Sequence, residues 1–527
     1  MSISIKHPGL PRRYPIGIQN FEKLRSDGYL YVDKTKQMYQ LIQMGNPYFL
    51  SRPRRFGKSL ILSTLEAYFQ GKKELFEGLF IETVEKDWKQ YPVLHLDLNA
   101  EKYETYEDLE KILSRQLREW EELYETGGAG ESYSGRFMTV IQKAYQKTGL
   151  RVVVLIDEYD KPLLRSFHDE KLQNSFRELL TGFYSVLKSA DAWLQFIFIT
   201  GVTKFAQMGI FSNLNQLMDI SLDNRFCDLC GLTRKEIEDT FDPEIEALAV
   251  NNNMTHDEAI TELTCMYDGY FFNEDQQEGI FNPFSILNAL STQKLRSYWF
   301  ASGTPTFLAE MLQKTDYDLR ELEGIEVSAN SLIADRASAN NPIPMIYQSG
   351  YLTIKSYDEE FRTYKLGFPN EEVKYGFLNF VTPFYTSISA DNTAFYVGRF
   401  VSELRQGDVD AFLTRLRSFF ADFPYELNDR TERHYQVVFY LIFKLMGQFA
   451  EAEVRSARGR ADAVVKTKDA IFVFEFKLNG TVQEALEQIN NKGYLIPYEA
   501  DGRKLVKIGV NFNSEERNIG EWKIEAQ

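Results

Sequence analysis

One short segment near the N-terminus constrains the fold of this chain more than any other feature. It runs from Arg52 to Ser59, follows an apolar strand-like segment at 48–51 and precedes an amphipathic helical pattern at 60–69. In a strand, loop and helix of this order, the backbone N–H groups of the loop and the helix N-terminus converge on one point and can bind phosphate. The segment therefore predicts a P-loop, in which Lys58 contacts the β- and γ-phosphates of a nucleotide and the Ser59 hydroxyl binds Mg²⁺.

The loop departs from the usual form G-x-x-x-x-G-K-[ST] at its first position, where Arg52 replaces glycine. Glycine tolerates backbone conformations that other residues avoid, so the backbone at this corner is expected to differ. Pro53 and the neighbouring arginines can still shape a concave nest of N–H groups for an anion.

A second segment supplies the acidic half of such a site. Residues 151–156 read RVVVLI and are followed by Asp157 and Glu158. An apolar strand with an acidic pair at its carboxyl end is the Walker B arrangement, in which the aspartate holds Mg²⁺ and the glutamate orients and activates water. The alternative is a solvated loop after a core strand, but the upstream P-loop favours a nucleotide site.

Two further polar residues are candidates for contact with the phosphates. Thr200 ends the apolar segment 194–199 and could sense the γ-phosphate, although an ordinary strand-end threonine is the alternative. Arg225 is a weaker candidate for stabilising charge in the transition state. The residues expected to bind nucleotide are Arg55, Phe56, Gly57, Lys58, Ser59, Leu60, Asp157 and Thr200, with Glu158 catalytic and Ser59 and Asp157 as metal ligands.

Length and periodicity indicate several domains, because 527 residues are too many for one hydrophobic core. Four apolar strand-like segments alternate with helical patterns in the first part of the chain, at 48–50, 93–98, 152–156 and 194–200. This alternation predicts a mostly parallel sheet covered by helices. Further along, acidic helical stretches at 234–248 and 256–267 and turn-rich pieces such as 340–344 predict a helical lid or a winged-helix-like region.

Two apolar segments near the C-terminus resemble a β-hairpin, at 459–465 and 470–477, after a long helix at 431–447. Side chains alternate along a strand, so Glu475 and Lys477 share one face. The hairpin can bring Asp462 beside them. Two carboxylates and a lysine gathered there would bind a divalent metal and activate water for an in-line attack on phosphate.

The alternative for this hairpin is a pair of strands with exposed charges. Glu475 and Lys477 interrupt an otherwise apolar strand, where charges are costly unless they are paired or metal-bound, and this favours the site. Gln488, on a helical pattern at 484–494, could point toward the scissile phosphate, and Glu432 could supply another carboxylate. The expected catalytic residues are Asp462, Glu475, Lys477 and Gln488, of which Asp462 and Glu475 bind Mg²⁺ or Mn²⁺.

Net charge, apolar segments and cysteine content limit which partners and which cellular compartment can be expected. The net charge of −16 argues against a protein that coats nucleic acid along its whole surface, although basic patches at 52–58 and 455–460 could bind phosphate. No membrane-spanning segment or secretory signal is visible, so a cytoplasmic protein without a membrane partner is expected. Cys227, Cys230 and Cys265 are expected to be buried and apolar, with metal binding as the alternative.

Six segments together resemble a known family, at residues 31–35, 52–59, 155–161, 199–205, 282–285 and 474–478. They resemble the bacterial AAA-ATPase-like family that carries a C-terminal PD-(D/E)XK nuclease domain, and the resemblance spans nearly the whole chain. The loop without its first glycine is similar to the form typical of that family. Gln488 and Tyr494 match a motif often found after the nuclease lysine.

The pattern of elements along the chain and the resemblance together predict an α/β fold in three parts. These are a P-loop NTPase domain of the ASCE or AAA-like type with a parallel sheet at 1–235, a mainly helical middle region at 236–405, and a restriction-endonuclease-like α/β domain at 406–527. The resemblance also implies that Gly57, Lys58, Ser59, Asp157 and Glu158 match the nucleotide motifs and that Asp462, Glu475 and Lys477 match the nuclease triad.

These sites predict a protein that binds and hydrolyses ATP and couples its nucleotide state to metal-dependent cleavage of nucleic acid, with DNA favoured over RNA. The alternative is a nucleotide-dependent switch or scaffold whose nuclease-like domain binds nucleic acid or protein without cutting it. Assembly into a homo-oligomer is compatible with both hypotheses.

Overall fold

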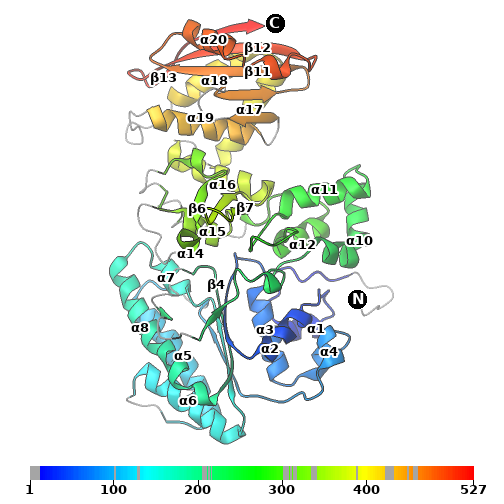
Figure 1. Ribbon diagram of the computed structural model, residues 1–527, viewed down its shortest axis with the longest axis vertical. Coiled ribbons are helices and arrows are strands. Elements are labelled where there is room, and N and C mark those ends of the chain that lie inside the picture. Colours follow the sequence, from blue (N-terminus) through cyan, green and yellow to red (C-terminus); the bar gives the residue numbers. More distant parts are fainter. Residues whose placement is uncertain are drawn as a thin grey trace. The chain divides into compact units, whose positions relative to one another are not determined.

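A five-stranded parallel sheet organises the first part of the chain (Figure 1). Its strands are β1 (Pro47–Ser51), β2 (Val93–Asp97), β3 (Val152–Asp157), β4 (Leu194–Gly201) and β5 (Met218–Asp219), in the spatial order β2-β3-β4-β1-β5. All neighbouring pairs are parallel. Strand β4 therefore lies between β1, which leads into the P-loop, and β3, which ends in the acidic pair, and the carboxyl ends of all three meet at one edge of the sheet.

The structure is a computed structural model that describes residues 12–99, 102–127, 131–204, 210–211, 214, 216–300, 308, 311–312, 317–333, 341–386, 390–421, 432–447, 450–454 and 461–526. It divides into two compact units, residues 1–315 with 324–373 and residues 316–323 with 374–527, and the parallel sheet belongs to the first. The domain boundaries expected near residues 235 and 405 stay a prediction.

Helices cover both faces of the parallel sheet. Figure 1 shows α5 (Tyr106–Tyr124), α6 (Tyr133–Thr148) and α8 (Glu170–Ser189) on one face and α3 (Lys58–Phe69) on the other. All residues of β3 are buried, because a parallel sheet between two helical layers exposes neither face. The shorter helices of this part are α1 (Phe21–Ser26), α2 (Thr35–Met44), α4 (Phe80–Val84) and α7 (Lys161–Arg165).

The middle of the chain combines helices with a small sheet. Helices α10 (Arg234–Asn251), α11 (His256–Tyr267) and α12 (Pro283–Thr292) come first. Then β6 (Glu326–Ser328), α14 (Ala329–Ile333), α15 (Ile343–Gln348), β7 (Thr353–Asp358) and β8 (Thr363–Gly367) form an antiparallel sheet in the order β6-β8-β7 with two helices inserted. The expectation of a helical lid or a winged-helix-like region here stays a prediction.

The second unit contains a mixed sheet between helical layers. Its strands β9 (Glu451–Val454), β10 (Ala463–Lys466), β11 (Ala470–Leu478), β12 (Lys504–Asn513) and β13 (Asn518–Ala526) lie in the order β13-β12-β11-β10-β9, and only β11 and β12 are parallel neighbours. Its helices are α16 (Glu371–Tyr385), which begins in the first unit, α17 (Ala390–Arg405), α18 (Val409–Ala421), α19 (Glu432–Met446) and α20 (Val482–Asn491).

The alternation along β11 decides which side chains face which helix. Ile471 and Val473 pack with Leu486 of α20, whereas Phe474 and Phe476 contact Phe443 of α19. Glu475 follows the parity of Ile471 and therefore lies on the α20 side of the sheet.

Most expected elements are present at or near their predicted bounds, including the four strands of the first part and the C-terminal hairpin. The turn-rich piece expected at 340–344 is wrong for its last two residues, because α15 begins at Ile343. Pro344 lies in the first turn of this helix, where proline is tolerated. The three cysteines are free. Cys230 is buried as expected, but Cys227 is only partly buried and Cys265 is exposed, so the expectation of burial is wrong for these two.

Candidate nucleotide and nuclease sites

The P-loop follows β1 directly and ends where α3 begins, at Lys58. Its backbone is left-handed at two positions, Arg55 (φ 68°) and Gly57 (φ 94°). Left-handed backbone is uncommon for residues other than glycine. The Lys58 ammonium donates hydrogen bonds to the carbonyl oxygens of Arg52 (3.0 Å) and Pro53 (3.1 Å), so the lysine folds back over its own loop.

Arg52, which replaces the usual first glycine, is buried with 1% of its surface exposed. Its guanidinium donates to the carbonyl oxygens of Ser51 (2.9 Å), Ser221 (2.8 Å) and Phe226 (3.2 Å). It also lies 4.0 Å from the centre of the Phe272 ring. Burial lowers the pKa of this guanidinium. The side chain thus joins the base of the loop to later segments of the chain, a role that a glycine could not fill.

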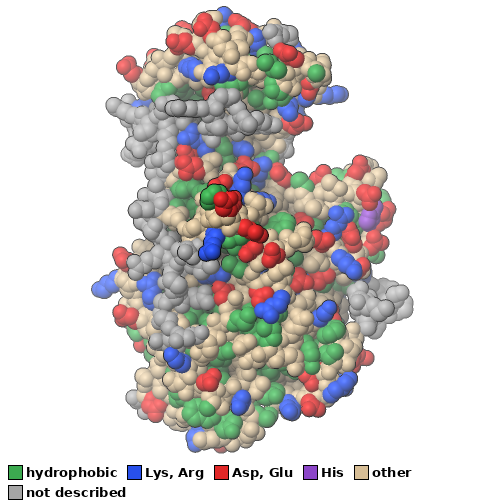
Figure 2. Space-filling model, viewed as in Figure 1, with side chains coloured by type: hydrophobic (Ala, Val, Ile, Leu, Met, Phe, Trp, Pro, Cys, Tyr) green, Lys and Arg blue, Asp and Glu red, His purple; other side chains and the backbone are tan. Residues whose placement is uncertain are grey.

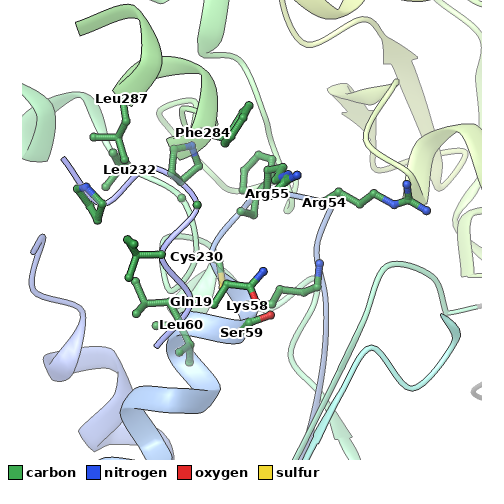
Figure 3. Close-up of a pocket in the computed structure, with 18 of the residues that line it drawn as sticks. Gln19, Arg54, Arg55, Lys58, Ser59, Leu60, Cys230, Leu232, Phe284 and Leu287 are labelled. Atoms are coloured by element: carbon green, nitrogen blue, oxygen red, sulfur yellow. The ribbon is translucent and has the colours of Figure 1, made fainter. Parts of the chain in front are cut away.

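A pocket of about 630 Å³ opens beside the loop (Figure 3). Figure 3 shows Cys230, Leu232 and Leu287 on one side of Lys58 and Ser59, and Arg54 on the other. Four cations line this pocket without an ion pair to any carboxylate of the described residues: Arg54, Arg55, Lys58 and Arg165. The Arg55 guanidinium instead lies 4.9 Å from the centre of the Phe284 ring.

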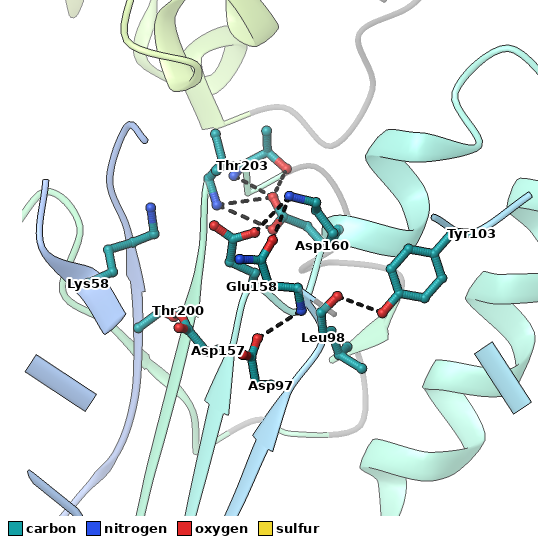
Figure 4. A network of polar contacts seen from close by, with 12 residues as sticks. Lys58, Asp97, Leu98, Tyr103, Asp157, Glu158, Asp160, Thr200 and Thr203 are labelled. Atoms are coloured by element: carbon teal, nitrogen blue, oxygen red, sulfur yellow. Dashed lines mark hydrogen bonds and ion pairs between the residues drawn. The ribbon is translucent and has the colours of Figure 1, made fainter. Parts of the chain in front are cut away.

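The acidic pair stands at the carboxyl end of β3, at the same end of the sheet as Lys58 (Figure 4). Asp157 is buried, and its Oδ1 accepts a hydrogen bond of 2.6 Å from the Thr200 hydroxyl on the adjacent strand β4. Thr200 is fully buried. Its hydroxyl therefore orients Asp157, and it is not among the residues that line the pocket.

Glu158 lines the pocket, and its backbone is left-handed (φ 50°). Its carboxylate pairs with Lys161 at 3.2 Å, and Lys161 also donates to Asn99 at 2.8 Å. Burial raises the pKa of Glu158. The positive charges of Lys58, Lys161 and Arg54 outweigh burial, so the pKa of this carboxyl lies below its ordinary value and the group is ionised at neutral pH.

The pocket gathers most of the residues expected from sequence. Those that line it are Arg55, Phe56, Gly57, Lys58, Ser59, Leu60 and Glu158. Asp157 and Thr200 lie behind them at the strand ends. Arg225 does not line the pocket; it is exposed, and its guanidinium pairs with Asp223 at 2.5 Å. Arg54, which the sequence placed only in a basic patch able to bind phosphate, also lines the pocket, and so does Lys161, which was not expected there although it follows the acidic pair closely.

The C-terminal carboxylates meet beside β11. Asp462 precedes β10, and its Oδ2 accepts a hydrogen bond of 2.8 Å from the backbone N–H of Phe476 on β11. Glu475 is buried with 2% of its surface exposed, and its Oε1 accepts a hydrogen bond of 3.0 Å from Lys477. The structure thus brings together the three residues expected at this hairpin.

Gln488 on α20 completes the cluster. It accepts a hydrogen bond of 2.6 Å from Lys477, donates to Glu475 and lies 3.3 Å from the hydroxyl of Tyr494. Burial and then the negative charge of Asp462 raise the pKa of Glu475 to about 7, although Lys477 opposes the shift. The second oxygen of Glu475, Oε2, is buried and has no hydrogen-bond partner among the described residues.

The unpartnered buried oxygen of Glu475 would suit a bound cation, because a charge in such a place is costly unless it is paired or metal-bound. Asp462 and Glu475 supply the oxygen ligands that Mg²⁺ and Mn²⁺ prefer. No group of three or more Asp, Glu, His or Cys side chains is placed to hold a metal within the described residues. The side chain of Glu432 and the patch at 455–460 lie outside the described residues.

Two families match separate parts of the chain. Residues 15–211 match the family described as AAA-ATPase-like, predicted AAA-ATPase, and residues 430–522 match the PD-(D/E)XK nuclease superfamily. A protein of Azotobacter chroococcum mcd 1, described as an uncharacterized protein in vnfD 5'region, is 34% identical over 526 residues, which are 98% of this chain and 99% of that protein. The chain belongs to the AAA-ATPase-like family with a C-terminal PD-(D/E)XK nuclease domain.

Within this AAA-ATPase-like protein, the first matched range contains the P-loop, the acidic pair and Thr200, and the second contains Asp462, Glu475, Lys477 and Gln488. The pocket wall formed by Leu232, Phe284 and Leu287 lies outside both ranges. The chain is also similar to the ORC2 protein of Aeropyrum pernix, solved as ADPNP-ADP complexes, with 10% identity, a TM-score of 0.25 and a match that covers 69% of this chain and 92% of that one. No helix within the described residues has the length and apolar character needed to span a membrane.

Proposed function

We propose that the first unit binds and hydrolyses ATP. The observation that carries this proposal is the set of four cations that line the pocket without a carboxylate partner, Arg54, Arg55, Lys58 and Arg165. Cations gathered in a half-enclosed pocket repel one another unless an anion joins them, and a triphosphate supplies several negative charges. The loop and the N-terminus of α3 add backbone N–H groups that point to the same place.

The other side of the pocket supports a nucleotide over a simple polyphosphate. This side of the pocket is lined by four apolar side chains, Phe284, Leu287, Leu232 and Leu60 (Figure 3). Apolar walls beside a phosphate-binding loop suit a planar base, which gains from burial and from stacking on an aromatic ring. A volume of about 630 Å³ lies within the range of sites that bind small molecules and cofactors.

Each predicted group has a defined task in this reaction. Lys58 would bind the β- and γ-phosphates, and Ser59 and Asp157 would hold Mg²⁺, which neutralises phosphate charge when bound. Glu158 would orient the attacking water and accept its proton, a task suited to a carboxylate that is ionised at neutral pH. Thr200 would keep Asp157 in place through their 2.6 Å hydrogen bond.

We further propose that the second unit cleaves phosphodiester bonds of nucleic acid, with DNA favoured over RNA. Asp462 and Glu475 would hold a divalent cation, which supplies Lewis acidity to this chemistry when bound. Lys477 would stabilise negative charge that develops on the phosphate. Gln488 would hold Lys477 and Glu475 in position through its hydrogen bonds to both side chains. ATP turnover would control this cleavage.

A scaffold that binds nucleic acid or protein without cutting it is the competing function. Acidic and basic side chains are interspersed on the face in Figure 2, so the described part of that face carries no continuous basic surface. The net charge of −16 supports access to nucleic acid that is gated or assisted by a partner. The intact set of Asp462, Glu475 and Lys477 supports cleavage over the scaffold.

One set of variants tests both proposed reactions. Purified protein is assayed for binding of a labelled ATP analogue, for phosphate release, and for cleavage of single- and double-stranded DNA and RNA with Mg²⁺ or Mn²⁺, with and without ATP. Lys58→Ala should lose nucleotide affinity, with Lys36→Ala on the exposed side of α2 as the matched control. Asp462→Ala should abolish cleavage and leave phosphate release intact. Wild-type protein that cuts nothing under any condition would favour the scaffold.

A further inference from the structure

The three arginines of the P-loop have different surroundings. Arg52 is buried and donates to backbone carbonyl oxygens, and Arg55 lies over the Phe284 ring. Arg54 lines the pocket and is half-buried, and its guanidinium makes no hydrogen bond or ion pair with any described residue. Figure 3 shows the side chains of Arg54 and Arg55 leaving the loop in different directions.

The backbone at Arg54 and its neighbour accepts hydrogen bonds, whereas the Arg54 guanidinium has no hydrogen-bond or ion-pair partner among the described residues. The indole N–H of Trp299 donates a hydrogen bond of 3.2 Å to the Arg54 carbonyl oxygen. On the preceding residue, Pro53, the carbonyl oxygen accepts from Lys58 at 3.1 Å. These two contacts hold the backbone from which the Arg54 side chain starts, so this part of the loop needs no further ordering when the guanidinium binds an anion.

Arg54 and Glu158, the residue expected to activate water, line the same pocket. Arg54 also lies close to the segment that follows α15, because its positive charge opposes the upward effect of burial on the pKa of Tyr351. Arg54 therefore shares the pocket with Glu158 and borders the segment after α15.

We propose that Arg54 is a catalytic arginine that the P-loop supplies to its own nucleotide: its guanidinium contacts the γ-phosphate during hydrolysis and stabilises the charge of the transition state. This inference rests on the proposed ATPase function. In the step concerned, the water oxygen forms a bond to the γ-phosphorus, and the bond from that phosphorus to the β–γ bridging oxygen breaks. ADP leaves with the electron pair, and Glu158 takes the water proton.

The position suits a guanidinium better than an ammonium. Two N–H groups of a planar fork can bind two phosphate oxygens at once, whereas a lysine binds as a point charge. Arginines that act on transferring phosphoryl groups contribute about 10³- to 10⁵-fold to the rate, so the effect is large enough to separate from a change in binding.

The test compares Arg54→Ala, Arg54→Lys and a matched surface control, Arg118→Ala on the exposed side of α5. Single-turnover hydrolysis should fall about 10³-fold in Arg54→Ala, while affinity for a non-hydrolysable ATP analogue changes less than about tenfold. The complex with ADP and fluoroaluminate, which imitates the transition state, should form in wild type and in Arg118→Ala and should be lost in Arg54→Ala. Arg54→Lys should keep ATP affinity and recover only a small part of the rate.

Rescue separates a catalytic loss from a folding defect. Guanidinium ion at a concentration far below that which unfolds the protein should raise hydrolysis by Arg54→Ala and leave wild type unchanged. Hydrolysis by Arg54→Ala at the wild-type rate would overturn the inference and leave the ATPase proposal standing. An equal loss of ATP affinity and rate would also overturn it, because Arg54 would then bind the ground state. Wild-type protein that does not bind ATP would remove both proposals.

Discussion

The Thr200 hydroxyl donates a hydrogen bond of 2.6 Å to Asp157 Oδ1, across the ends of the adjacent strands β4 and β3. Both side chains are buried, so water cannot replace this bond easily. A threonine at the end of a central strand was expected to sense the γ-phosphate directly. In this structure its hydroxyl orients the carboxylate expected to hold Mg²⁺, which means that its influence on the nucleotide passes through Asp157.

Thr200→Val should therefore weaken Mg²⁺-dependent ATP turnover about 10- to 100-fold, the usual effect of losing a residue that orients a metal ligand. Valine keeps the shape of threonine and removes only the hydroxyl. The apparent Mg²⁺ affinity, measured from phosphate release against Mg²⁺ concentration, should fall, while affinity for ATP without metal should not. An unchanged Mg²⁺ requirement would assign no orienting role to Thr200.

Glu158→Gln should leave ATP bound and slow hydrolysis about 10²- to 10⁴-fold, because an amide still hydrogen-bonds water but cannot accept its proton. The pKa of Glu158 lies below its ordinary value, so the wild-type carboxylate is ready to act as a base at neutral pH. Equilibrium binding and single-turnover hydrolysis measure the two effects separately. Hydrolysis at the wild-type rate would mark Glu158 as a strand-end carboxylate that only pairs with Lys161.

Metal binding at the C-terminal site should depend on pH through Glu475. Its folded pKa is about 7, raised from 4.5, and a cation binds the ionised form. Apparent Mn²⁺ affinity, measured by calorimetry, should fall up to about tenfold for each pH unit below 7 and level off above it. Glu475→Gln should lose this affinity at every pH, with Glu487→Gln on the exposed side of α20 as the matched control.

The same pKa predicts the opposite trend for stability without metal. The folded state holds the Glu475 proton more tightly than the unfolded state, so its contribution to stability is present below about pH 4.5 and is lost as pH rises to about 7. Hydrogen exchange of β11 peptides, corrected for intrinsic rates, should show this loss in wild type and not in Glu475→Gln. A pH-independent Mn²⁺ affinity would contradict both expectations.

Much of the fold could be predicted from sequence because its signals are local. The apolar run at 152–156 lies between two helical layers, and a strand buried on both faces is expected to be apolar up to its end. The alternation of Glu475 and Lys477 placed both on one face of β11, where the structure has them beside Gln488. Residue spacing sufficed in these cases.

What could not be predicted depends on contacts between residues far apart in the chain. Strand pairing puts Thr200 beside Asp157, and no spacing along the chain reveals that their side chains bond. Strands β12 and β13 also lacked a motif that would distinguish them from other apolar segments. Arg52 is the clearest example, because its carbonyl partners at 221 and 226 are about 170 residues away.

These distant partners decide what happens when Arg52 is replaced by glycine. Arg52→Gly gives the loop the first glycine of the usual motif, and on motif grounds alone it should improve the site. We expect instead that the free energy of unfolding falls by about 3 kcal/mol, because three carbonyl oxygens lose a donor and a cavity opens beneath Phe272. In Arg52→Met, which keeps most of the side-chain volume and loses only the donors, the free energy of unfolding should fall by less.

Urea unfolding followed by tryptophan fluorescence measures the free energy of unfolding of each variant. ATP affinity should weaken in the same order, with Arg52→Gly the weaker of the two. Equal or greater stability in Arg52→Gly would show that the buried guanidinium costs more than its hydrogen bonds return.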